Sequence, residues 1–157
     1  MAASLTIRLG EALDLPHLLS LYRLLEVAPE PALSIEAARE RLRQLETNPL
    51  HRLYVAEREG HIVGTFSMIF VPGISHSARE SCVIEDLVVD ARMQGCGIGR
   101  QMMRFAMAQC ATRNCYKLTL SSHVRRERAH RFYEALGFRR HGYSFLIELA
   151  EPNSRTP

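Results

Sequence analysis

The stretch Gln94-Gly95-Cys96-Gly97-Ile98-Gly99-Arg100 joins two different sequence patterns. Before it, residues 83–89 form an apolar run typical of a buried strand, and after it residues 98–111 have helical spacing. Glycines in such a turn let backbone N–H groups approach an anion closely, and the helix N-terminus adds partial positive charge. The stretch therefore predicts an anion site between a strand and a helix.

Two common phosphate-binding motifs do not fit these glycines. The dinucleotide fingerprint G-x-G-x-x-G fails in both registers, because Arg100 or Met102 stands where the last glycine is required. A P-loop requires Gly-Lys-Ser/Thr, and no lysine follows. The pattern that is present is Q-x-x-G-x-G, which begins at Gln94.

The composition is that of an ordinary globular protein. The chain has 157 residues, of which 46% are hydrophobic and 24% charged. No apolar run approaches the ~18 residues that span a membrane, and no signal peptide is evident. We expect a cytoplasmic protein with a single domain over residues 1–150 and a disordered tail over 151–157.

Cysteine spacing and net charge exclude further classes. Cys82, Cys96, Cys110 and Cys115 form no C-x-x-C pair and no metal-ligand spacing, which indicates reduced thiols and no metal. A net charge of +3 is too mild to indicate nucleic acid. The arginine-rich residues 123–141 lack interleaved stacking aromatics, so a solvated face is the simpler interpretation. We therefore expect neither a nucleic-acid nor a membrane partner.

Hydrophobic periodicity and turn residues predict an α/β fold with a mixed sheet in the order βααβββαβαβ. Ser34 is a predicted N-cap, Glu59-Gly60 a hairpin turn, Gly137 a helix C-terminus, and residues 27–32 a proline-marked break. We expect strands at 4–9, 51–58, 61–71, 82–89 and 116–121, helices at 14–27, 35–47, 98–112 and 125–136, and a last strand or hairpin at 138–149.

The glycine pattern resembles the acyl-CoA pyrophosphate loop of the GCN5-related N-acetyltransferase (GNAT) family. The run at residues 84–89 precedes it at the family's distance, and residues 129–138 match the family's A-x-x-F-Y-x-x-x-G-F. The resemblance covers roughly residues 5–148. It implies a mixed, mostly antiparallel twisted sheet flanked by helices, and direct transfer of an acetyl group from acetyl-CoA to a primary amine in a ternary complex.

Amine acetylation benefits from a base, because an alkyl amine with a pKa near ~10 is almost fully protonated at pH 7. Glu85 and Asp86 lie inside an apolar strand, where carboxylates are costly to bury without a reason. Adjacent strand residues face opposite sides of a sheet, so we expect at most one to point into the site. We favour Glu85 as the base, directly or through water, and hold Asp86 as the alternative base or a substrate anchor. Structural salt bridges are the competing interpretation.

The resemblance assigns the remaining catalytic and donor-binding roles. It places Tyr133 where the family's tyrosine donates to the departing CoA sulfur, although a core aromatic beside Phe132 is the simpler alternative. It also implies that the strand backbone binds the pantetheine arm and that the glycine loop binds the pyrophosphate. The donor-binding residues so implied are Leu87, Val88, Val89, Gln94, Gly95, Gly97, Ile98, Gly99 and Arg100.

The acceptor is less well defined. His76 and Arg79 lie in the loop before the acidic strand, where the family often builds its acceptor pocket, although a histidine in a loop is more often a solvent-exposed residue than a site residue. Arg126 stands where many members of the family have an asparagine that contacts the cofactor. That asparagine contact is therefore in doubt here, although the side chain of Arg126 or Arg125 could touch a CoA phosphate.

Two small-amine branches, the glucosamine-6-phosphate and aminoalkylphosphonate N-acetyltransferases, look most similar. A protein or peptide N-acetyltransferase and a non-catalytic acyl-CoA-binding regulatory domain stay open, as does a homodimer.

Overall fold

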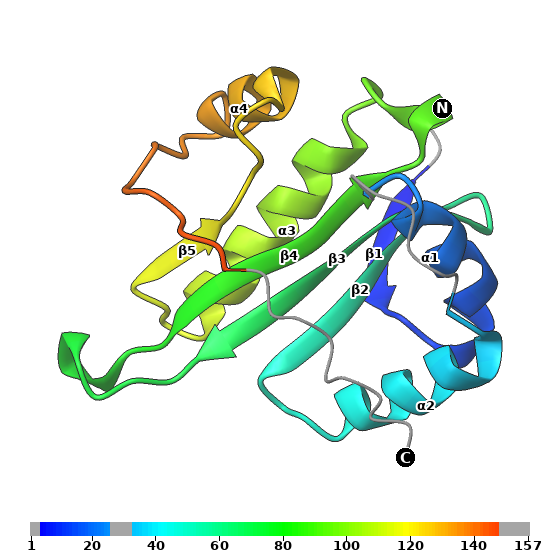
Figure 1. The fold of residues 1–157 in the computed structure, drawn as a ribbon, viewed down its shortest axis with the longest axis horizontal. Helices are drawn as coiled ribbons and strands as arrows, with labels where there is room; N and C mark the ends of the chain where they lie inside the picture. The colour runs from blue at the N-terminus through cyan, green and yellow to red at the C-terminus, as the bar shows by residue number, and fades with distance from the viewer. Residues whose placement is uncertain (1–3, 26–32, 148–157) are drawn as a thin grey trace, which may run out of the picture. The chain divides into compact units, whose positions relative to one another are not determined.

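A computed structural model describes residues 4–25 and 33–147, and the chain divides into compact units at residues 1–120 and 121–157 (Figure 1). Among the residues described, the first unit contains five strands and the second contains one helix. The elements are β1 (Leu5–Leu9), α1 (Leu15–Tyr22), α2 (Ile35–Glu46), β2 (His51–Arg58), β3 (His61–Val71), β4 (Ser81–Val89), α3 (Ile98–Thr112), β5 (Lys117–Leu120) and α4 (Glu127–Glu134), with short 3-10 turns η1 (Ala12–Asp14), η2 (His76–Ala78) and η3 (Ala91–Met93).

The strands form one sheet in the order β1-β2-β3-β4-β5. The first four pair antiparallel, while β5 lies parallel to β4 after the α3 crossover. Long runs of β-branched and aromatic residues and the tight turn at Glu59-Gly60, where both residues have positive φ, explain the β2–β3 hairpin. The predicted mixed, mostly antiparallel sheet is confirmed.

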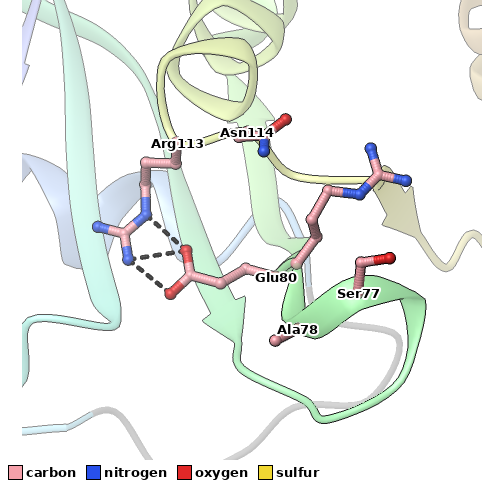
Figure 2. Close-up of a pocket in the computed structure, with 6 residues that line it drawn as sticks. Ser77, Ala78, Glu80, Arg113 and Asn114 are labelled. Atoms are coloured by element: carbon pink, nitrogen blue, oxygen red, sulfur yellow. Dashed lines mark hydrogen bonds and ion pairs between the residues drawn. The ribbon is translucent and has the colours of Figure 1, made fainter.

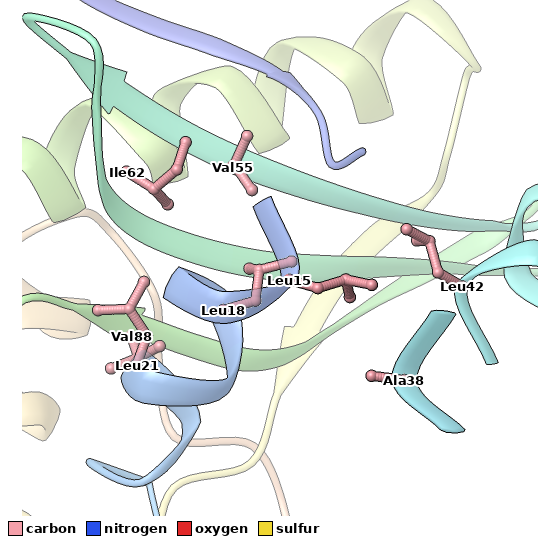
Figure 3. Close-up of a cluster of buried hydrophobic side chains, with 8 residues drawn as sticks. All are labelled: Leu15, Leu18, Leu21, Ala38, Leu42, Val55, Ile62 and Val88. Atoms are coloured by element: carbon pink, nitrogen blue, oxygen red, sulfur yellow. The ribbon is translucent and has the colours of Figure 1, made fainter. Parts of the chain in front are cut away.

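Helices α1 and α2 cover one face of the sheet (Figure 3). Leucines at helical spacing on α1 pack with side chains from three strands, and α2 closes the end of the cluster. The hydroxyl of Ser34 accepts a hydrogen bond from the N–H of Ala37 at 3.1 Å, so the predicted N-cap is confirmed. The cluster consists of Leu15, Leu18, Leu21, Ala38, Leu42, Val55, Ile62 and Val88.

Helix α3 covers the opposite face. Tyr54 and Phe66, which are paired across β2 and β3, stack with ring centroids 5.3 Å apart, and Phe105 of α3 packs edge-on against both. Gly64 of β3 permits a close approach, since a Cβ there would stand 2.9 Å from the sulfur of Met102. The strand that precedes the glycine loop and the helix that follows it are thereby held to one sheet.

One predicted element is absent from the described residues. Residues 138–147 form no strand, which corrects the strand or hairpin expected at 138–149. The side chains that suggested it are almost fully exposed, as at Tyr143 and Phe145, and an alternating pattern makes a strand only where another strand pairs with it.

Several predictions fall partly outside the described residues. Helix α1 ends at Tyr22, short of the predicted residue 27, and the proline-marked break and the tail at 151–157 are not described. The single domain over residues 1–150 stays a prediction. Within the described part of the chain, no helix is long and apolar enough to cross a membrane.

Candidate active site

The centre of the site is a β-bulge in β4. Ser67 of β3 pairs with Glu85, but the next pair along the sheet joins Thr65 to Val88, so β4 carries one extra residue there. Asp86 lies within the bulge and has a left-handed backbone conformation, with a φ of 54°. Aspartate tolerates this left-handed conformation better than the β-branched and bulky residues around it.

Because of the bulge, the expectation that Glu85 and Asp86 face opposite sides of the sheet is wrong. The side chain of Val88 packs in the apolar cluster under α1. Glu85 lies three residues earlier and would face the opposite side in a regular strand. The bulge interrupts the alternation, so Glu85 and Val88 share one face. The charge of Asp86 also acts on Tyr22 of α1 and on His51 of β2, which places it toward the same side. Both carboxylates are exposed.

The two carboxylates differ in their electrostatic surroundings. Partial burial raises the pKa of Glu85, and the neighbouring charge of Asp86 raises it further. A raised pKa makes a carboxylate a stronger base, and within the described residues Glu85 forms no salt bridge that would lower its pKa. These features fit the role expected of Glu85 better than a structural ion pair does.

The backbone after the bulge lies at an unpaired edge. β5 pairs with β4 from Ser81 to Ile84, and in the described part of the chain the pairing ends there. Residues 85–89 therefore present peptide groups on the β5 side that can bind an extended ligand. Leu87, Val88 and Val89, predicted to contact the pantetheine arm, lie in this segment.

The glycine loop is tied to the end of β4. The carboxylate of Asp90 accepts a hydrogen bond from the N–H of Arg92 at 2.9 Å and opens the short turn η3. The side-chain amide of Gln94 then donates to the carbonyl of Val89 at 3.2 Å. The loop's position relative to the strand edge thus depends on these two polar contacts.

Two glycines shape the loop itself. Gly95 and Gly97 have φ values of 81° and 80°, and a Cβ at either position would meet no atom within 4 Å. Gly97 is also the N-cap of α3 and provides no side-chain cap. The first intrahelical bond runs from Gln101 to the carbonyl of Gly97, so the N–H groups of Ile98, Gly99 and Arg100 have no partner within the helix.

Tyr133 lies in the second unit, near the end of α4. Gly137 has a φ of 92°, and its N–H bonds to the carbonyl of Glu134 while that of Phe138 reaches the carbonyl of Tyr133 at 3.1 Å. This is a Schellman motif, which confirms the predicted C-terminal glycine. The rings of Phe132 and Phe138 pack edge-on against Tyr133, with centroids 5.1 and 5.9 Å away.

The electrostatics of Tyr133 keep its phenol protonated. Burial raises its pKa, and the positive charge of Arg126 lowers it in part. A neutral phenol is the form that can donate a hydrogen bond to a thiolate. Arg126 occupies the N-cap position of α4 without capping it through its side chain.

The two predicted acceptor residues lie at the other end of β4. The ring of His76 stacks on Tyr116 at 4.0 Å, and the guanidinium of Arg79 lies 5.9 Å from the same ring. Arg79 borders a hollow beside Glu80, whose carboxylate accepts two hydrogen bonds from Arg113 (Figure 2), whereas His76 is not among the residues that line it. Because β4 begins at Ser81, about 13 Å of strand separates this hollow from Glu85. The structure does not bring them together.

Sequence reasoning missed a set of polar side chains around Asp86. Thr65 and Ser67 are buried within β3, and the hydroxyl of Thr65 donates to the carbonyl of Tyr54 at 2.8 Å. Burial raises the pKa of Tyr22, a hydrogen bond with Thr65 lowers it, and the charge of Asp86 raises it. The alternation of Thr65 and Ser67 with apolar neighbours was the available signal.

The chain matches the Acetyltransferase (GNAT) family over residues 18–138, a span that includes the bulged strand, the glycine loop and α4. It is a member of the GNAT family. The prediction of an acyl-CoA-dependent N-acetyltransferase is thereby confirmed, and GNAT acetyltransferases use acetyl-CoA as a substrate. Cys82, Cys96, Cys110 and Cys115 of this GNAT chain are free thiols in the structure.

Two characterised relatives carry the names of the small-amine branches suggested by the sequence. The glucosamine 6-phosphate N-acetyltransferase of Trypanosoma brucei brucei is 30% identical over 145 residues, which cover 92% of this chain and 96% of that protein. The aminoalkylphosphonate N-acetyltransferase of Salmonella typhimurium is 31% identical over 105 residues, covering 67% and 66%. The crystal structure of the Arabidopsis thaliana glucosamine-6-phosphate N-acetyltransferase superposes with a TM-score of 0.82 at 25% identity, covering 94% and 99%.

Proposed function

We propose that this GNAT enzyme transfers the acetyl group of acetyl-CoA to the primary amine of a small molecule, directly and in a ternary complex. The observation that carries the proposal is the arrangement along one segment of chain. A bulged strand with two exposed carboxylates and an unpaired edge leads through the loop into a helix whose N-terminus has no side-chain cap.

The donor would bind along this segment in two parts. The pyrophosphate suits the free N–H groups at the start of α3, where the helix dipole favours negative charge and no Cβ obstructs the approach at Gly95 or Gly97. The pantetheine arm, which carries amide groups, suits the unpaired backbone of residues 87–89. Arg100, exposed in the first turn, adds positive charge near the same place.

The ammonium nitrogen loses two protons in the reaction, and the departing sulfur can gain one. Glu85 takes a proton from the ammonium, directly or through water, and the free amine attacks the thioester carbonyl. The bond between carbonyl carbon and sulfur then breaks, the nitrogen releases its second proton to solvent to give the neutral amide, and the phenol of Tyr133 donates a hydrogen bond to the departing thiolate. A backbone N–H on the β4 edge can stabilise the oxyanion that forms between these steps.

The names of the relatives support the acceptor class. Both named relatives act, by their names, on small amines that carry phosphate or phosphonate. We therefore place the acceptor of this chain among small amines rather than proteins. A peptide acceptor and a non-catalytic acyl-CoA-binding role are the outcomes against which the assay is designed.

The test is an acceptor panel with acetyl-CoA, read as release of free CoA thiol. It includes glucosamine 6-phosphate, 2-aminoethylphosphonate, glucosamine and a lysine-containing peptide. We expect thiol release to depend on one of the small amines. Release with the peptide alone would favour protein acetylation, and CoA binding by calorimetry without any release would favour the non-catalytic domain.

Replacing Gly97 tests the donor site. Gly97→Val adds a branched side chain where the pyrophosphate approaches, so the Kd for CoA should rise by more than about tenfold in calorimetry. The matched control is Gly60→Val, because Gly60 has a similar φ of 76° and equally open surroundings in the β2–β3 turn. Both variants carry the same backbone strain, so equal CoA affinity in the two would show that the loop does not bind the donor.

Replacing Tyr133 tests the sulfur contact. Tyr133→Phe keeps the packing against Phe132 and Phe138 but removes the hydroxyl. Turnover should fall by about ten- to a thousandfold, in kcat and kcat/KM alike, while acetyl-CoA binding changes little. Tyr143→Phe serves as the control in the same unit, since Tyr143 is 92% exposed. Full turnover in Tyr133→Phe, with chemistry shown to limit the rate, would assign the donor elsewhere.

Replacing Glu85 tests the base through its pH dependence. Glu85→Gln should be most defective at low pH, where few amines are free, and should approach the wild type as pH rises toward the amine's pKa near ~10. Because the pKa of Glu85 is raised, the wild-type kcat/KM should begin to decline, as the pH is lowered, at a higher pH than with a base of ordinary carboxyl pKa. Asp86→Asn is the comparison, and a pH-dependent defect there instead would identify Asp86 as the base.

A further inference from the structure

A buried nitrogen on the α1 side of the sheet has no hydrogen-bond partner. The Nε2 atom of His51 is shielded from solvent, and none of the described residues bonds to it. Burial lowers the pKa of His51, while the charge of Asp86 raises it. A buried polar atom left unpaired costs free energy, and an unexplained one in a folded protein invites a functional explanation.

Strand register places His51 on the same face as Glu85. His51 of β2 pairs with Ile69 of β3. Two residues further along the same two strands, Leu53 pairs with Ser67, and Ser67 also pairs with Glu85 of β4 on its other side. Residues directly opposite in antiparallel strands share a face, and so do residues two apart. The Cα atoms of His51 and Glu85 are about 12 Å apart by strand geometry.

Among the described residues that this register places on the face beside His51, none carries a positive charge: Ile69 and Leu53 are apolar, and Ser67 is polar. Ser67 is buried between Leu53 and Glu85, and the charge of Asp86 reaches His51. A group that binds there is therefore neutral rather than anionic. A hydroxyl fits best, because it can donate to or accept from Nε2 and so suits either tautomer of the imidazole.

We infer that Nε2 of His51 hydrogen-bonds a hydroxyl group of the acceptor while its amine lies at Glu85. The acceptor is then a hydroxylated amine, such as an amino sugar, rather than a simple aminoalkylphosphonate. This inference rests on the proposed function, in which Glu85 receives the amine. It adds a specificity residue on β2, outside the strand and loop that bind the donor.

The test uses His51→Leu, an apolar variant of similar size, with two acceptors. The KM for glucosamine 6-phosphate should rise about tenfold, while the KM values for acetyl-CoA and for the hydroxyl-free 2-aminoethylphosphonate stay unchanged. The Tm should hold or rise by about 2–4 °C, because the substitution removes an unpaired buried polar atom. His61→Leu, at the exposed far end of the β2–β3 hairpin, should change none of these values.

Two amide variants keep the test decisive if His51→Leu does not fold. His51→Gln places its amide near the position of Nε2 and should retain the low KM for glucosamine 6-phosphate, whereas His51→Asn reaches only the position of Nδ1 and should not.

An unchanged KM in His51→Leu, an equal rise for both acceptors, or equal KM values in His51→Gln and His51→Asn would overturn the inference and make His51 structural. A wild-type enzyme that acetylates no amine would instead overturn the proposed function.

Discussion

The bulge in β4 is the constraint on which the site depends. One extra residue between the pairs at Ser67 and Thr65 forces Asp86 into the left-handed region, a conformation that costs a non-glycine residue of order 1–2 kcal/mol. The fold retains this conformation of Asp86 because the segments of β4 on both sides of it are fixed by pairing with β3. The result is a strand that turns two carboxylates toward α1 and, past Ile84, has no β5 partner in the described residues.

Packing on the far face of the sheet links this bulge to the glycine loop. The close approach of Met102 to Gly64 sets the first turns of α3 against the part of β3 that pairs with Val89. Gln94 adds a direct contact between loop and strand. The uncapped helix N-terminus therefore has a defined position relative to the unpaired backbone of β4. An extended donor with an anionic end needs both at a fixed separation, because preorganised groups lose little entropy on binding.

The α1 face combines an apolar cluster with a polar margin. Val55 and Val88 bury their side chains under α1, while Ser67, Glu85 and His51 lie in the neighbouring rows of the same three strands. The cluster supplies the burial that stabilises the unit. The margin contains groups that are costly to bury, which is typical of a site where binding rather than stability sets the residue type.

Local signals in the sequence determined most of the elements and the glycine loop. The glycine pattern, the Ser34 cap, the Glu59-Gly60 turn and Gly137 each depend on the conformation of a few neighbouring residues, so a short stretch is enough to predict them. Tertiary structure decided the rest. The shared face of Glu85 and Asp86 depends on pairing with β3, residues 138–147 form no strand because they have no described partner, and the polar set at His51 comes from strands that are adjacent only in the folded sheet. Register is a relation between strands, and no single stretch of sequence contains it.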